Sequence, residues 1–162
     1  MKKLFCFAVL AALGLVGVGC QTNSGSHGSV VVNYDHPEKF TDFRSDYSRP
    51  TSQVYMDDLR EYLQHRAGRL IPAGETLTLN FTDIDMAGDI TPMASSVRVQ
   101  RPIYPLKINF TWVITDAGGK IVTQGTEKLV NAFAGSQMGF DRDDPLFHEK
   151  AQMDDWIRHT LR

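Results

Sequence analysis

The side chains in this chain that could do chemistry are a few histidine, serine and acidic residues, and their spacing excludes the familiar catalytic sites. His148 and Glu149 begin like the zinc motif H-E-x-x-H, but Gln152 occupies the position of the second histidine. Ser136 lies in the segment Gly135–Gly139, but Ala134 stands two residues before it, where a nucleophile elbow needs a glycine. The sequence therefore predicts no catalytic residue.

Two acidic segments offer a weaker possibility, a site for a divalent metal ion. Asp83 and Asp85 open a segment that begins like a calcium loop, but Ala94 stands where that loop needs a bidentate glutamate. His36 has Asp35, Glu38 and Asp42 close by in sequence, and an imidazole flanked by acids is suited to metal binding or to base catalysis. If the two segments meet, His36, Asp83 and Asp85 are candidate metal ligands.

The alternative interpretation of both segments is structural. Aspartates at the end of a strand are commonly solvated and stabilise turns, and acids around a histidine on a loop commonly face water or cap a helix. We favour this alternative and predict no cofactor. A periplasmic metal-binding protein, or a metal-dependent enzyme that uses the same three residues, remains the second hypothesis.

The residue with the clearest chemical role is Cys20, at the end of an export signal. Lys2 and Lys3 precede an apolar run, residues 4–18, which is shorter than the roughly 20 residues that a membrane-spanning helix needs. Gly17–Cys20 resembles the lipobox of bacterial lipoproteins, in which the cysteine takes a diacylglyceryl group and becomes the first residue after cleavage. The alternative is ordinary cleavage nearby, which leaves a soluble periplasmic protein with a free thiol.

The resemblance to lipoproteins implies an order of segments along the chain. Residues 1–19 are a signal peptide, residues 20–29 are the lipidated cysteine and a flexible tether, and residues 30–162 form a single domain. Gln21 is not the aspartate associated with retention in the inner membrane, so the resemblance implies the outer membrane, with the domain facing the periplasm. Several acyl chains on one residue, palmitate for example, provide stable anchoring.

Composition and charge indicate which classes of partner to expect. The chain has 162 residues, 42% of them hydrophobic, which suits one domain, and a formal net charge of −2 provides no basic surface for nucleic acid. Gly118 and Gly119 lie between two predicted strands, whereas nucleotide sites need a strand that leads into a helix. We therefore expect neither nucleic acid nor nucleotide as a partner.

The hydrophobic pattern predicts how the domain positions these residues. Leu106, Ile108, Phe110, Trp112 and Ile114 alternate with polar residues, which indicates a central half-buried strand, and a turn at 116–119 leads into its hairpin partner, residues 120–130. Strands are also predicted at residues 30–34 and 76–81, with a bulge near Thr82 because the apolar parity changes there.

Two helices complete the prediction. Apolar residues at helical spacing predict one over residues 50–70, and Asp144 as N-cap with Pro145 at the first helical position predicts another that reaches the C-terminus. The expected fold is α+β, with two layers: a mainly antiparallel sheet of four to five strands and two helices on one face.

Several short motifs follow one another along the predicted domain: Asp35–Asp42, Pro72–Leu77, Thr82–Asp89, Arg98-Val99, Ile103–Pro105, Asp144–Lys150 and Asp155-Trp156. Together and in this order they are similar to one family of exported proteobacterial proteins, the domain of unknown function 3016. The resemblance covers nearly the whole predicted domain and implies export and a compact α+β fold, but no activity, substrate or catalytic residue.

The sequence thus favours an envelope lipoprotein with a non-catalytic binding or accessory domain, tethered to the outer membrane through Cys20. Its expected partners are the membrane, through the lipid, and an envelope protein. Open strand edges and four tyrosines offer a candidate contact surface, although no binding residue is predicted; the tyrosines are Tyr47, Tyr55, Tyr62 and Tyr104.

Overall fold

The structure, a computed structural model, describes residues 27–45, 51–90, 98–99, 103–131 and 144–161. The predicted signal peptide, Cys20 and the tether up to residue 26 lie outside these residues, as does Ser136. The elements are, in order, β1 (Ser29–Tyr34), the 3-10 helix η1 (Pro37–Lys39), α1 (Gln53–Gly68), β2 (Thr76–Asp85), β3 (Asp89–Ile90), β4 (Arg98–Val99), β5 (Leu106–Thr115), β6 (Ile121–Asn131) and α2 (Phe147–Thr160).

Four strands form one sheet in the order β1-β2-β5-β6, and β3 pairs with β4 in a small separate sheet. β2, β5 and β6 are antiparallel neighbours, whereas β1 is parallel to β2. The parallel pair follows from the intervening helix, because a helical crossover returns the chain to the end of the sheet at which the first strand began. The predicted α+β class is confirmed, with a mixed sheet that is mainly antiparallel.

The alternating pattern of β5 places its apolar residues on one face, and Leu106, Ile108 and Phe110 are fully or almost fully buried. The register of β2 against β5 shifts between Phe81 and Asp83, which confirms the predicted bulge. This shift turns Ile84 toward the core although its parity in the sequence differs from that of Phe81.

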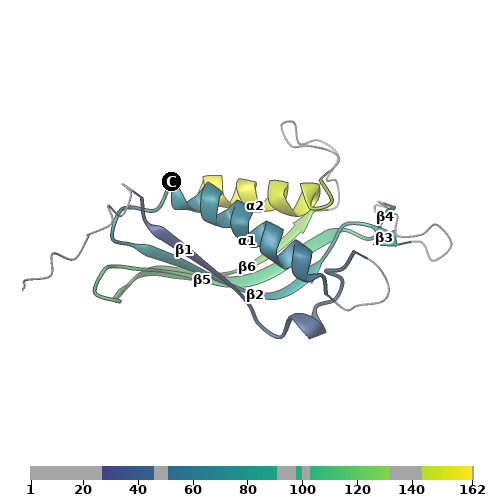
Figure 1. Cartoon of the computed structure of the whole chain (residues 1–162), viewed down its shortest axis with the longest axis horizontal. Coiled ribbons are helices and arrows are strands. Elements are labelled where there is room, and N and C mark those ends of the chain that lie inside the picture. The colour runs from purple at the N-terminus through teal and green to yellow at the C-terminus, as the bar shows by residue number, and fades with distance from the viewer. Residues whose placement is uncertain (1–26, 46–50, 91–97, 100–102, 132–143, 162) are drawn as a thin grey trace, which may run out of the picture.

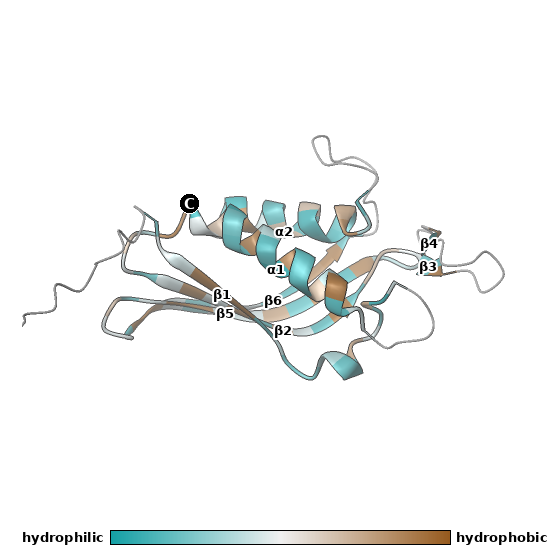
Figure 2. Ribbon diagram, in the orientation of Figure 1, coloured by the Kyte–Doolittle hydropathy of each residue, from teal (hydrophilic) through white to brown (hydrophobic). Residues whose placement is uncertain are grey.

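Both long helices lie on the same face of the sheet (Figure 1), as predicted. Figure 2 shows hydrophilic residues along the visible sides of the helices and hydrophobic positions at intervals along the strands. The core lies between the layers, where Leu59 and Leu63 of α1 and Ile157 of α2 are fully buried. Trp156 packs edge-on against Phe110 of the sheet, with 5.0 Å between ring centroids.

The helices begin slightly later than predicted, for local reasons. The side chain of Ser52 accepts a hydrogen bond from the N–H of Tyr55, so α1 begins at Gln53 rather than near residue 50. Asp144 is not the N-cap of α2. The Asp144 carboxylate accepts a hydrogen bond from the N–H of Leu146 at 2.7 Å, and the Asp144 carbonyl accepts one from the N–H of Phe147 at 3.0 Å. These two hydrogen bonds form a turn before the helix.

The N-terminal end of the described chain is held against the end of α1. The N–H of Gly28 donates to the carbonyl of Ile71 at 2.8 Å, and a Cβ on Gly28 would lie only 2.3 Å from the Ile71 side chain. His27 pairs with Pro72, so the contacts of the described residues extend back to His27. Figure 1 shows the start of β1 and the ends of both helices at the same end of the domain. No helix of the described residues is both long and apolar enough to cross a membrane.

Candidate functional site

The three predicted metal candidates each have local partners. His36 has a left-handed backbone with φ of 50° before η1, and its exposed ring lies 3.2 Å from the Glu38 carboxylate. Asp83 accepts hydrogen bonds from the N–H and hydroxyl of Thr41 at 2.7 and 3.0 Å. Asp85 forms an ion pair with Lys107 at 2.9 Å.

The two acidic segments do meet, as the metal hypothesis required. The N–H of Asp42 donates to the carbonyl of Ile84 at 3.0 Å, and the N–H of Met86 donates back to the carbonyl of Asp42 at 2.9 Å. Among the described residues, however, no three histidine, cysteine or acidic side chains form a group that could hold a metal ion. The metal hypothesis therefore stays a prediction that no geometry in this part of the chain supports.

The meeting point holds a buried ion pair that the sequence did not predict. Arg98 of β4 donates to both carboxylate oxygens of Asp42, at 2.8 and 3.1 Å, and Arg44 donates to the same carboxylate at 3.1 Å. Arg98 also donates to the carbonyls of Gly88 and Arg44. One arginine thus joins β4 to Gly88 and to residues 42–44, which lie 54 to 56 residues away in sequence.

A second ion pair lies at the start of α2 and joins it to α1. The ammonium group of Lys150 donates to Asp58 at 2.8 and 2.9 Å and to Asp144 at 2.6 Å. The same ammonium group lies 5.7 Å from the centre of the Tyr62 ring. Lys150 is therefore balanced by two carboxylates although it is largely buried.

Between these two ion pairs lies Glu149, which is 1% exposed. Its carboxyl group accepts hydrogen bonds from the backbone N–H groups of Glu149 and Ala87, but Oε2 is buried with no hydrogen-bond partner among the described residues. Burial raises the pKa of Glu149 to about 7, although those hydrogen bonds and the charge of Arg98 oppose the rise. A buried acid with an unsatisfied oxygen destabilises a fold, so its position suggests a function.

Glu149 borders a cavity of about 170 Å³ that we call the acid pocket. The pocket lies where the end of β2, strand β4 and the start of α2 come together. One signal in the sequence could have found it: Glu149 and Lys150 occupy helical positions between Leu146 and Met153, on the stripe that faces the core. The lining residues are Met86, Ala87, Arg98, Asp144, Pro145, Phe147, His148 and Glu149.

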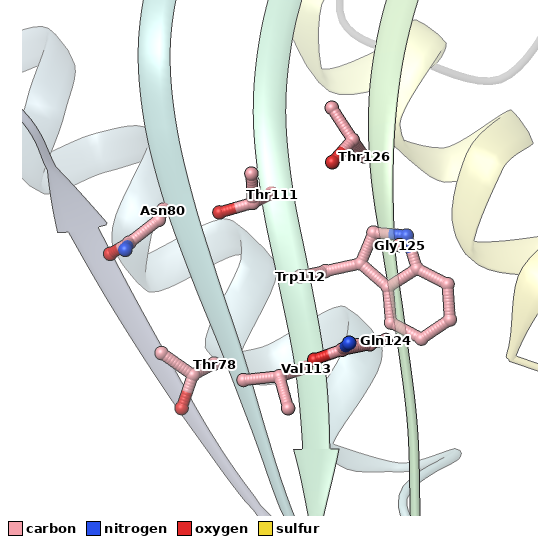
Figure 3. A pocket seen from close by; sticks show the side chains of 8 residues that line it. All are labelled: Thr78, Asn80, Thr111, Trp112, Val113, Gln124, Gly125 and Thr126. Atoms are coloured by element: carbon pink, nitrogen blue, oxygen red, sulfur yellow. The ribbon is translucent and has the colours of Figure 1, made fainter. Parts of the chain in front are cut away.

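The second region is the face of the sheet that neither α1 nor α2 covers, which we call the open sheet face. It contains a hollow of about 420 Å³ whose lining includes hydroxyl and amide side chains from β2, β5 and β6 (Figure 3). None of the lining residues is titratable, so the hollow can donate and accept hydrogen bonds but holds no acid, base or activated nucleophile. The lining residues are Thr78, Asn80, Thr111, Trp112, Val113, Gln124, Gly125 and Thr126.

The open sheet face ends at β6, an edge strand of 11 residues. Among the described residues β6 pairs with β5 alone, and Val122 and Val130 are 56% and 63% exposed. Gly125 leaves room on the helix side for the Trp112 indole, whose Nε1 donates to Glu127 at 3.1 Å. A long edge strand with exposed apolar residues is a template for pairing with another strand.

The comparisons with known proteins support the family resemblance found in the sequence. No curated protein matches the chain, and no solved structure matches it. Residues 28–159 match the family described as "Protein of unknown function (DUF3016)". This match includes β1, both long helices and both candidate regions, and by it the chain belongs to the DUF3016 family of proteins of unknown function.

Proposed function

We propose that the protein is a non-catalytic binding domain, which captures an extended segment of an envelope protein as an added strand at β6. In this proposal a lipid on Cys20 holds the domain at the outer membrane, facing the periplasm. The observation that carries the proposal is the long, exposed edge of β6.

Strand addition suits the geometry of β6. The strand spans Ile121–Asn131, and every residue in it is exposed or partly exposed. Folded proteins usually protect such edges with proline, charged side chains, bulges or a covering segment. β6 contains no proline, its charged residues are Glu127 and Lys128, and its register against β5 shifts only near its start, opposite Thr115. An added strand would bind through main-chain hydrogen bonds, which provide affinity with little dependence on sequence.

The hollow beside β6 would supply the specificity. Gln124 and Thr126 of β6 lie on the open sheet face opposite Val113 and Thr111 of β5, so alternate side chains of an added strand would lie next to them. Hydroxyl and amide groups without charges favour uncharged polar side chains. We therefore expect a partner segment rich in serine, threonine, asparagine or glutamine.

The tether suits a domain that works close to a membrane. Residues 21–26 lie between Cys20 and the described residues, and in this proposal they act as a flexible coil, whose root-mean-square reach at that length is about 13 Å. The described chain begins beside the end of α1 and leads into β1, the edge strand opposite β6. The sequence alone supports the lipid.

Site-specific photo-crosslinking in the intact cells of the source organism tests strand addition. A crosslinking residue at Val122 or Val130 should capture the same envelope protein, whereas one at exposed Glu61 on α1 should not. Capture alone is not sufficient support. The crosslinked peptide of the partner must be an extended segment, and capture must depend on the β6 main chain.

A matched pair of proline variants tests that dependence. Thr123 and Thr126 are both exposed and lie three residues apart without a bulge between them, so their amides point to opposite sides of β6. One of Thr123→Pro and Thr126→Pro removes an amide that donates to β5 and lowers the melting temperature strongly. The other removes an outward amide, keeps the fold and should abolish capture. If the well-folded variant captures the partner as efficiently as the unmodified chain, strand addition is excluded. A crosslinked species of twice the chain mass would show that a second copy of this chain, rather than an envelope protein, pairs with β6.

The lipid is tested separately by the mass of the mature N-terminus. The proposal predicts an N-terminal Cys20 that carries acyl chains, and release of the Cys20→Ser variant from membranes. An unmodified thiol would remove the lipid from the proposal and leave the binding role of β6 intact.

A further inference from the structure

We propose that the acid pocket binds the primary ammonium group of a small ligand, with the carboxylate of Glu149 as its acceptor. This site is separate from β6 and independent of the function proposed for that strand. It lies at the start of α2, whereas the described chain begins beside the end of α1. Figure 1 shows the start of α2 and the end of α1 at opposite ends of the domain.

The hydrogen bonds of Glu149 indicate what is missing from the pocket. Its carboxyl group already accepts from two backbone N–H groups, and Oε2 remains buried without a partner among the described residues. An ionised carboxylate has only acceptor sites, so the missing group must be a donor. A primary ammonium group has three N–H donors and a positive charge, and hydrogen bonds between ionised groups are the stronger ones.

The charges around the pocket indicate that the donor is a monocation. The other ionised groups in the two bordering clusters are balanced: Asp42, Asp58 and Asp144 are acids, and Arg44, Arg98 and Lys150 are bases. Glu149 is the remaining charge when it is ionised. One added ammonium group would neutralise it, whereas a divalent cation would leave an excess positive charge.

The size and the walls of the pocket fit a small organic cation better than a metal ion. A volume of about 170 Å³ exceeds the roughly 30 Å³ share of one water molecule in liquid water. Met86, Ala87, Pro145 and Phe147 provide apolar contacts for carbon atoms. The described residues also lack a group of three metal-ligating side chains, and a carboxylate with apolar walls is a common setting for an amine.

The proposal makes binding depend on pH in a defined direction. The ligand binds ionised Glu149, and burial raises the pKa of Glu149 to about 7, so affinity should rise as pH increases through this value. The other titratable or charged groups that border the pocket are Arg98, Asp144, His148 and, through Asp144, Lys150. Arg98 is held by Asp42, and Lys150 by two carboxylates, so Glu149 is the group whose ionisation the ligand changes most directly.

The test uses the full mature chain with glutamate side chains labelled with carbon-13 at the carboxyl group, titrated with methylammonium chloride at pH 8. We expect saturable shifts of the Glu149 signal with a dissociation constant on the order of 10 mM, because so small a ligand has few atoms to contribute affinity. Under saturating methylammonium the titration midpoint of Glu149 should move to lower pH. Tetramethylammonium, which has the same charge but no N–H donor, should bind at least about tenfold more weakly.

Two variants complete the test. Glu149→Gln keeps the shape of the side chain but removes its charge and its labelled signal. Its response is therefore followed through the backbone amide signal of Ala87 on the pocket wall, and no saturable shift should occur. Asp89→Asn removes an exposed carboxylate from β3, the strand that pairs with Arg98 of the pocket wall, and it should leave binding unchanged. If the Glu149 signal of the unmodified chain does not respond, or responds equally to both cations, the ammonium site is excluded. An ordered water molecule alone would then satisfy Oε2. This conclusion comes from the unmodified chain, so it does not depend on whether either variant folds.

Discussion

The acid pocket and the open sheet face differ in the charge and the burial of their polar side chains. Around the pocket, ionised groups are buried and held by contacts between segments far apart in the chain, such as Asp42 with Arg98. On the open sheet face, uncharged side chains such as Thr111 and Thr126 lie in solvent on neighbouring strands. The contrast suggests that the pocket region depends on every member of its network, whereas the open face can change its side chains without unfolding.

The largest expected effect comes from breaking the buried ion pair. Asp42→Ala leaves the Arg98 guanidinium partly buried without its carboxylate, so we expect a loss of about 3 to 5 kcal/mol in the free energy of unfolding. Urea denaturation measures this loss. The double variant Asp42→Ala/Arg98→Met should recover much of the loss, because it removes the more buried of the two guanidinium groups that Asp42 pairs: Arg98 is 17% exposed and Arg44 28%. A loss below about 1 kcal/mol in the single variant would show that the pair adds little and would weaken the contrast.

The second prediction concerns the pH dependence of stability. Burial raises the pKa of Glu149 from 4.5 to about 7, so the folded protein binds this proton more tightly than the unfolded chain does. The resulting stability is fully present below pH 4.5 and is lost as pH rises through about 7, a difference of about 3 kcal/mol. Denaturation curves of the unmodified chain and of Glu149→Gln should therefore diverge between these pH values. Parallel curves would mean that Glu149 titrates normally in the folded state.

The sequence predicted the layers of this fold because the relevant signals are local. The alternation in β5 assigns each side chain to a face without knowledge of the rest of the chain, and the change of parity after Phe81 identifies the bulge in the same way. The order strand, helix, strand from β1 to β2 also contains the signal for the parallel pairing, although only a mainly antiparallel sheet was predicted.

The acid pocket could not be found in this way, because it depends on contacts across the chain. Arg98 lies 56 residues from Asp42, and only the meeting of β4 with the segment after η1 brings them together. Glu149 on the buried stripe of α2 was a local anomaly, but the sequence does not contain the strand order that decides what lies opposite it. The metal hypothesis gained no support for the same reason, because it too depended on contacts across the chain. The two segments meet, but Asp83 binds Thr41 and Asp85 binds Lys107.

The third prediction concerns the side of β6 that faces the helices, where we expect a substitution to lower stability. A Cβ at Gly125 would lie 2.7 Å from Nε1 of Trp112, on the side of the sheet that the helices cover. Glu127 and the Trp156 ring hold that indole in place, so Gly125→Ala should lower the free energy of unfolding by about 1 to 3 kcal/mol. Denaturation followed by tryptophan fluorescence measures it. Gly68→Ala, whose Cβ would meet only atoms at 3.9 Å, is the control and should be neutral or stabilising.

The smallest expected change in stability is on the open sheet face itself. Thr126→Val keeps the shape and the strand preference of the side chain but removes its hydroxyl group, so the free energy of unfolding should change by less than about 0.5 kcal/mol. If the hollow recognises a partner strand, the same variant should weaken photo-capture from Val130. Thr115→Val, at the far end of β5 and outside the hollow, should change neither quantity. A loss of stability above about 1 kcal/mol for Thr126→Val would mean that this hydroxyl supports the fold. The open face would then share the pocket's dependence on individual side chains, and weaker capture could no longer be assigned to recognition.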